Sequence, residues 1–326
     1  MPAVRGGEIA IKYKVLTGGK KKEMTDIYPY NIPGYTDEVV EYWVQNAPSP
    51  RNYAIYKIPK PNGEYRIIEE PCPDLKQLQR ALLPLLDQVP RYSRVYGVKG
   101  TSAVGNAGFH FTTRPKVIIK MDIKRFFPST TRENFERRLT DQLPVPTSPL
   151  LRLAPIFFVD NGGRYRLPTG APTSPLVASI AFTGIDMQLV YYCLHFFGLS
   201  YSRYVDDLCF SGHYYPDGFQ KDVTRIVEAG GYKINHKKSE VIYNTGAQEI
   251  TGTLINSSTK RLRTTREYRR NLRAALDQAA RLKEVDVSLQ GRIAYLKQVD
   301  PPTHTSMMEY YNRRIDRWAS EPTGEP

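Results

Sequence analysis

The sequence predicts an α+β fold in which helices pack on one face of a ferredoxin-like sheet. A β-branched run at residues 117–121 predicts a strand that ends at Asp122. Residues 201–211 predict the two strands of a tight hairpin. Apolar residues at helical spacing predict helices over about 174–197 and 219–229. The order strand, helix, hairpin, helix is typical of a split βαβ sheet.

Shorter elements are predicted on both sides of this central region. They are strands over residues 53–58, 65–69 and 249–255, the last closing the sheet, a turn at 61–63, and helices over 75–89 and about 132–142. Helical apolar spacing at Leu75, Leu78, Leu82 and Leu86 predicts one of these helices, and Pro61-Asn62-Gly63 predicts a turn. The sequence from Thr264 to Glu267 fits a capping box, so a further, basic helix is expected to begin at about Thr265.

The charge balance favours a polyanionic partner. The 326 residues include 46 Lys and Arg against 33 Asp and Glu, a formal net charge of +13. Cationic side chains that neutralise phosphates release counterions, and this release drives binding to nucleic acid. A basic surface that is simply solvated is the alternative interpretation of the same numbers.

Cysteine usage and hydropathy exclude several other classes. The three cysteines form no CxxC pair, so the sequence indicates neither a zinc site nor a disulfide framework and predicts a reducing, cytoplasmic location. The N-terminal residues 1–14 lack the apolar core of a signal peptide. The apolar stretch 176–199 includes Asp186, Gln188 and His195, which favours a buried core helix and no membrane partner.

Three carboxylates stand where two predicted strands end. Asp122 follows the first strand, and Asp206 and Asp207 lie at the tip of the hairpin. If the strands are neighbours, the carboxylates converge, and carboxylates that repel one another are stabilised by a cation. Oxygen ligands in a wet cleft suit Mg²⁺, and two such ions can activate a hydroxyl group and stabilise a leaving pyrophosphate. Ordinary turn chemistry is the alternative explanation of an Asp-Asp pair.

Five segments resemble the conserved boxes of reverse transcriptases. Tyr204-Val205-Asp206-Asp207-Leu208 resembles their YxDD box. Four others resemble the fingers box, the first metal-binding box, the LPQGxPxSP box and a later lysine box, at residues 58–68, 120–129, 167–175 and 231–239. The boxes follow the family order over residues 55–240. The resemblance implies an RNA-directed DNA polymerase with the right-hand fold of fingers, ferredoxin-like palm and helical thumb.

Two further segments resemble signatures of retron-type reverse transcriptases. Residues 106–110 match NAxxH, and 250–252 resemble VTG with Ile250 in place of Val. The resemblance implies that these segments and the thumb helix bind the cognate RNA. The residues concerned are Asn106, Ala107, His110, Ile250, Thr251, Gly252, Arg266, Arg270 and Arg273.

The resemblance also implies roles for residues around the carboxylates. Asp122, Asp206 and Asp207 would be catalytic and, with the Ile123 carbonyl, would hold two Mg²⁺ ions. Lys60, Arg66, Phe127, Thr169, Gly170 and Lys238 would contact the incoming nucleotide, with Phe127 excluding a 2′-hydroxyl. Two positions depart from the family pattern. Thr169 replaces the usual Gln, and Val205 replaces the Ala of most retron enzymes.

The family pattern implies a division of the chain into four parts. They are an N-terminal segment at 1–50, fingers at 51–116 with a retron-specific insert at about 96–116, a palm at 117–258 with part of the fingers intercalated at about 132–170, and a thumb at 259–326. About sixty residues follow the start of the thumb helix. This length leads us to expect no fused nuclease or RNase H.

The function implied by the resemblance is that of a retron reverse transcriptase. Such an enzyme copies part of a cognate non-coding RNA into single-stranded DNA, priming from an internal RNA 2′-hydroxyl to give branched RNA–DNA, in an anti-phage defence system. Its partners would be that RNA, its cDNA, dNTPs and a separately encoded effector protein. Three alternatives stay open: a group II intron type enzyme, a non-catalytic RNA-binding scaffold of the same fold, and a DNA-templated or template-free polymerase.

Overall fold

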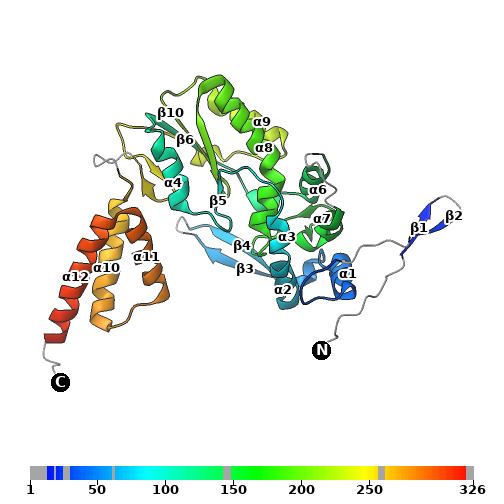
Figure 1. Ribbon diagram of the computed structural model, residues 1–326, viewed down its shortest axis with the longest axis horizontal. Helices are drawn as coiled ribbons and strands as arrows, with labels where there is room; N and C mark the ends of the chain where they lie inside the picture. The colour runs from blue at the N-terminus through cyan, green and yellow to red at the C-terminus, as the bar shows by residue number, and fades with distance from the viewer. Residues whose placement is uncertain are drawn as a thin grey trace. The chain divides into compact units, whose positions relative to one another are not determined.

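The computed structural model describes residues 13–17, 20–24, 30–60, 63–141, 148–255 and 261–320, and it confirms the predicted α+β class (Figure 1). The chain divides into two compact units. Unit 1 contains Met1–Tyr92, Arg125–Asp186 and Ala229–Tyr232, and unit 2 contains Ser93–Lys124, Met187–Glu228 and Lys233–Pro326. Each unit is described by itself below.

Unit 2 is built around a five-stranded sheet with the order β11-β6-β10-β9-β5. Its strands are β5 (Val95–Tyr96), β6 (Val117–Asp122), β9 (Ser200–Tyr204), β10 (Asp207–Gly212) and β11 (Glu240–Tyr243). Four of them are antiparallel neighbours, and β5 joins β9 in parallel. In chain order the four antiparallel strands lie 4-1-3-2, which is the ferredoxin-like arrangement that the sequence predicts.

One predicted strand of this sheet was wrong. Residues 249–255 do not close the sheet; that place belongs to β11. Instead, β12 (Glu249–Ile250) and β13 (Thr253–Leu254) form a separate small sheet with β14 (Arg263–Thr264). The two candidate strands have similar local patterns, and only long-range pairing distinguishes them.

Helices cover both faces of the five-stranded sheet, not one as predicted. On one face, Ala107 of α4 (Ala103–Thr112) packs with Ile118, Cys209 and Ile250 in a buried apolar cluster. Successive strand residues point to opposite faces, so Phe210 lies on the other face. There its ring meets Phe219 of α9 (Phe219–Ala229) at a centroid distance of 5.0 Å.

A bundle of three helices follows the small sheet in unit 2. It consists of α10 (Arg266–Leu282), α11 (Val287–Val299) and α12 (Pro301–Ser320). The helix predicted to begin at about Thr265 is confirmed, because Thr265 is the N-cap and its side chain accepts a hydrogen bond from the Tyr268 amide. The core of the bundle is made by Leu272, Leu276, Ala279, Leu289 and Leu296.

The described part of unit 1 carries three two-stranded antiparallel hairpins and several short helices. The elements are β1 (Tyr13–Thr17), β2 (Lys20–Met24), α1 (Asp37–Asn46), η1 (Pro50–Asn52), β3 (Tyr53–Pro59), β4 (Tyr65–Pro71), α2 (Pro73–Ala81), α3 (Leu83–Asp87), α5 (Phe126–Ser129), α6 (Arg132–Asp141), α7 (Ser148–Leu153), η2 (Ala154–Phe157), β7 (Val159–Asp160) and β8 (Tyr165–Arg166). The predicted hairpin of β3 and β4 is confirmed, while Pro61 and Asn62 of its turn lie outside the described residues. The single helix predicted at 75–89 is two helices, because Pro84 lies in the first turn of a second helix that begins at Leu83.

The long helix α8 (Ser174–Phe197) has the predicted bounds and belongs to both units. Among the described helices it is the one long and apolar enough to cross a membrane. However, 67% of its most apolar 18-residue window is buried inside the protein. The prediction of a core helix is therefore confirmed.

Candidate active site

Two of the three predicted carboxylates face each other across neighbouring strands. In the antiparallel register of β6 and β10, Asp122 is the partner of Asp207. Asp206 precedes β10, and its carbonyl accepts a hydrogen bond of 2.9 Å from the Ile123 amide. Asp122 is 6% exposed, Asp206 is half-buried and Asp207 is exposed. The fold thus brings Asp122, Ile123, Asp206 and Asp207 together at one end of the sheet.

The turn that carries Asp206 is held in an unusual backbone conformation. Val205 has φ of 54°, a left-handed value that is costly for a β-branched residue. Its amide donates to the Tyr96 carbonyl at 3.1 Å, and its carbonyl accepts from the buried Arg203 guanidinium at 2.9 Å. A Cβ on Gly97 would lie 2.5 Å from Val205 Cγ2. Because glycine has no Cβ, position 97 leaves room for the Val205 side chain in this turn.

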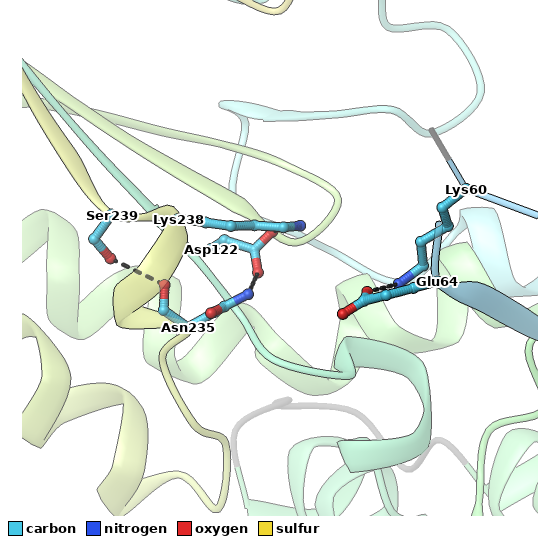
Figure 2. A network of polar contacts seen from close by, with 6 residues as sticks. All are labelled: Lys60, Glu64, Asp122, Asn235, Lys238 and Ser239. Carbon is cyan, nitrogen blue, oxygen red and sulfur yellow. Dashed lines mark hydrogen bonds and ion pairs between the residues drawn. The ribbon is translucent and has the colours of Figure 1, made fainter. Parts of the chain in front are cut away.

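The Asp122 carboxylate is bound by two side chains from the segment after α9 (Figure 2). Lys238 Nζ donates to Oδ1 at 2.7 Å, and Asn235 Nδ2 donates to Oδ2 at 3.1 Å. The Asn235 amide also donates to the Asp122 carbonyl at 2.7 Å. The hydrogen bond to Asp122, with the charges of all three aspartates, raises the pKa of the mostly exposed Lys238. Sequence reasoning missed Asn235, although it lies in the same box as Lys238.

Negative charge accumulates at this end of the sheet. The Asp207 carboxyl reaches solvent, yet desolvation by the surrounding protein and the charges of Asp206 and Asp122 raise its pKa to about 6. Bound divalent cations reverse this effect, so the donor set fits Mg²⁺. In the described residues, no group of three or more His, Cys, Asp or Glu side chains forms a ready-made metal cluster. The fit of this site to Mg²⁺ rests on the three aspartate carboxylates and their negative charge.

The family is decided by a match that spans most of the chain. A family model described as "Reverse transcriptase (RNA-dependent DNA polymerase)" matches residues 58–274. The chain belongs to the reverse transcriptase family. The predicted right-hand polymerase class agrees with this membership and with the ferredoxin-like order of the sheet.

Several of the curated proteins that the chain resembles are retron reverse transcriptases. The chain is 32% identical to the retron Mx65 reverse transcriptase of Myxococcus xanthus, covering 77% of this chain and 62% of the relative. For the retron Mx162 enzyme of the same organism the values are 32%, 77% and 58%. For the retron Ec83 enzyme of Escherichia coli they are 28%, 77% and 84%. The chain thus spans about six tenths of the length of the two Myxococcus relatives.

Solved structures give only a distant likeness. The apo telomerase of Candida tropicalis matches with a TM-score of 0.49 and 11% identity, covering 83% of this chain and 58% of that chain.

The nucleotide-binding residues predicted for this chain fall mostly in unit 1. Lys60 and Arg66 belong to the β3–β4 hairpin and its turn, where Lys60 pairs with Glu64 at 3.0 Å (Figure 2). Thr169 and Gly170 lie in the loop before α8. Lys238 differs from these residues, since it lies in unit 2 beside Asp122.

A mostly buried ion pair docks the loop of Thr169 on β4. The guanidinium of Arg166 makes two hydrogen bonds of 2.6 Å with the Glu69 carboxylate. The Glu69 amide then donates to the Thr169 carbonyl at 2.6 Å. Gly170 has φ of 132°, and a Cβ there would lie 2.8 Å from Ile68 Cγ2. The loop therefore requires glycine at this point of close approach.

The predicted sugar-contacting residue, Phe127, is half-buried on the short helix α5. Its neighbour Phe126 is 4% exposed and anchors the helix by packing against Phe182 and Tyr232. Arg125 begins the helix with φ of 52°. The backbone of Phe127 is thus held by its neighbours while its ring keeps exposed surface.

The side chains of the NAxxH segment, which were predicted to bind RNA, lie inside the protein. Asn106, Ala107 and His110 are at most 1% exposed, because this side of α4 packs against the sheet. Both ring nitrogens of His110 lie 2.7 Å from serine hydroxyls, of Ser211 and Ser202. Burial lowers the pKa of His110 to about 3, so the ring is neutral. These side chains have no free surface with which to touch RNA.

The structure brings the second retron-like segment next to the first. Thr251 and Gly252 form the two-residue turn between β12 and β13, with φ of 45° and 82°. The Thr251 hydroxyl donates to the Ala103 carbonyl of α4 at 2.8 Å, and Ile250 packs in the same cluster as Ala107. Only Gly252 of this segment is exposed.

The predicted thumb arginines keep exposed surface on α10. Arg266, Arg270 and Arg273 are all exposed. The Arg273 guanidinium lies 4.2 Å from the centre of the Tyr310 ring on α12, a cation–π contact that orients it. An RNA contact by these three residues stays a prediction.

Proposed function

We propose that the protein is an RNA-directed DNA polymerase of the retron type. The observation that carries this proposal is the register that pairs Asp122 with Asp207 beside the strained Val205–Asp206 turn, in a chain that belongs to the reverse transcriptase family. Carboxylates collected at one sheet end suit nucleotidyl transfer, in which charge develops on phosphate oxygens. The retron assignment is supported by the curated relatives.

Asp122, Asp206 and Asp207, with the Ile123 carbonyl, would hold two Mg²⁺ ions. When bound, the ions activate a 3′-hydroxyl and stabilise the leaving pyrophosphate. Lys238 already donates to Asp122, and its ammonium group would transfer that hydrogen bond to a phosphate oxygen when cations take over the carboxylate.

The remaining predicted contacts complete the substrate site. Lys60 and Arg66 would bind the triphosphate, because both are cationic and suit phosphate oxygens. Phe127 would lie beneath the sugar, and Thr169 and Gly170 would support the base and template. Thr169 is smaller than the usual Gln, so the backbone of its loop would make the main contact with the nucleotide.

RNA binding and catalysis would be carried out by different residues. The exposed arginines of α10 would contact the phosphate backbone without reading sequence. The region from residue 259 would then act as a thumb, with the palm at 117–258 and the fingers at 51–116.

The template would be a cognate non-coding RNA, primed from an internal 2′-hydroxyl to give branched RNA–DNA. A separately encoded effector and a role in cytoplasmic anti-phage defence complete the proposal.

Primer extension tests the polymerase proposal. The wild-type protein is compared with Asp206→Asn and with Asp217→Asn, a matched change at an exposed aspartate of unit 2. RNA, DNA and no template are supplied in parallel, and RNA binding is measured on the same preparations. We expect extension on RNA by the wild type and Asp217→Asn, and none by Asp206→Asn with RNA binding kept. Wild-type extension by Asp206→Asn would refute the carboxylate assignment.

A cellular experiment tests the retron part separately. The intact locus is expressed, and the cDNA is treated with debranching enzyme before electrophoresis. A mobility change on debranching is the expected result. Linear cDNA alone would contradict the retron assignment while leaving the polymerase proposal standing, and extension on DNA alone would indicate a DNA-templated enzyme.

A further inference from the structure

Four buried polar side chains join helix α4 to both strands of the hairpin that carries the carboxylates. His110 contacts Ser211 of β10 and Ser202 of β9, each at 2.7 Å. The Ser202 hydroxyl in turn donates to Asn106 Oδ1 at 2.6 Å. All four side chains are at most 1% exposed. We call Asn106, His110, Ser202 and Ser211 the α4 brace.

The direction of each hydrogen bond in the brace follows from the donor at Ser202. Because the Ser202 proton is used toward Asn106, the Ser202 oxygen accepts from His110 Nε2–H. A neutral ring with its proton on Nε2 has an acceptor at Nδ1, which therefore takes the Ser211 proton. The chain of donors runs Ser211, His110, Ser202, Asn106. Neutral His110 therefore accepts from one hydroxyl with Nδ1 and donates to the other with Nε2–H.

The brace lies on the same sheet face as the reacting groups. Asp207, Cys209 and Ser211 are every second residue of β10, so their side chains lie on the same face of the sheet. Ser202 of β9 pairs with Cys209 and lies on that face too. At about 3.3 Å per residue, the brace grips the hairpin roughly 7 to 13 Å from Asp207. No brace residue touches the carboxylates in the hydrogen bonds of the described chain.

Apolar packing alone would not specify the position of these strands as sharply. A hairpin that slips by one residue moves every side chain to the opposite face, which would remove Asp207 from Asp122. Each buried polar group left without its partner costs about 1–3 kcal/mol. The brace is satisfied in one alignment of β9, β10 and α4, so it penalises the others.

We infer that the α4 brace sets the position of Asp206 and Asp207, so that Asn106 and His110 are positioning residues of the polymerase and not RNA contacts. This inference rests on the proposed function for its chemistry. Helix α4 also accepts the Thr251 hydroxyl at the Ala103 carbonyl. The two retron-like segments therefore meet on one helix, whose buried side supports the carboxylate hairpin.

The test separates catalytic turnover from RNA affinity. The variants are His110→Leu, which removes both hydrogen bonds at similar side-chain volume, Ser202→Ala and their combination, with His213→Leu as the matched change at an exposed histidine of unit 2. Each is assayed on a generic primed RNA template for kcat and for the KM of dNTP, and for RNA Kd by filter binding. Assays are run below the lowest variant Tm. Hydrogen exchange of β9, β10 and α4 is measured on the same proteins.

The brace predicts a specific pattern. His110→Leu and Ser202→Ala should each lower kcat by on the order of 10- to 100-fold, since small displacements of reacting groups have effects of this size. KM and RNA Kd should change by less than about twofold, and the double variant should be no slower than the slower single variant, because both act through one contact. Exchange should accelerate in β9, β10 and α4, and His213→Leu should match the wild type.

Two results would overturn the inference. A rise in RNA Kd with kcat unchanged would make the segment an RNA contact, and multiplicative losses in the double variant would show that His110 does not act through Ser202. If the wild type itself extends no primer, the proposed function fails. In that case hydrogen exchange still decides the brace, because unchanged exchange in the variants would refute it.

Discussion

Removing the Asp207 charge should stabilise the cation-free protein at neutral pH while removing activity. The pKa of this carboxyl is raised from 3.8 to about 6 by desolvation and by Asp206 and Asp122. The folded state therefore binds the proton more tightly than the unfolded state. By linkage, Asp207 costs no stability below pH 4, costs progressively more as pH rises to 6, and carries the full cost above that. Asp207→Asn removes a cost that exists only at higher pH.

The magnitude follows from the size of the shift. A rise from 3.8 to about 6 is roughly two units, and each unit corresponds to about 1.4 kcal/mol. Because the side chain is exposed, solvent screening reduces the resulting ~3 kcal/mol to about 1 kcal/mol. Unfolding entropy of about 2.1 cal/mol/K per residue over 326 residues converts this to a Tm change of about 1–2 °C.

Thermal melting in EDTA measures this effect. Tm is recorded for the wild type, Asp207→Asn and the exposed control Asp217→Asn at pH 4.5 and pH 8. Asp207→Asn should melt about 1–2 °C above the wild type at pH 8 and above it by only about a third of that difference at pH 4.5. Added Mg²⁺ should raise the Tm of the wild type more than that of Asp207→Asn. A Tm difference independent of pH, or a variant less stable at pH 8, would refute the charge-repulsion reasoning.

Three further changes have expected outcomes. Phe127→Ala should increase incorporation of ribonucleotides relative to dNTPs in single-nucleotide extension, because the ring would no longer exclude the 2′-hydroxyl; an unchanged ratio would place the gate elsewhere. Glu69→Gln should break the bidentate pair with Arg166, lowering stability by about 3 kcal/mol in denaturant titration and raising the KM for dNTP, whereas wild-type KM would contradict a role for the docked loop. Gly97→Ala should cost about 1–2 kcal/mol through its positive φ and reduce kcat through the clash with Val205. Adding Val205→Ala should recover the kcat but not the φ cost, and full recovery of both would refute the strain argument.

The positions of the three carboxylates along the chain could be predicted from the sequence alone. One carboxylate follows a buried strand at residues 117–122, and two stand in the tight turn of the hairpin at residues 201–211. The long core helix and the start of α10 were equally readable, because apolar period and capping are local properties.

What only the tertiary structure decided is which distant groups share a contact. Short strands β5 and β11 have too few residues to stand out in the sequence, and β11 rather than 249–255 closes the sheet because of its pairing with β6. Asn235 is an ordinary polar residue until the chain places its amide 3.1 Å from Asp122. His110 lies in a segment that resembles an RNA-binding signature. Its ring is nevertheless held inside the protein by Ser202 and Ser211, which lie 92 and 101 positions away in the sequence. The direction in which a side chain points depends on the partners that folding supplies, and a linear pattern does not contain them.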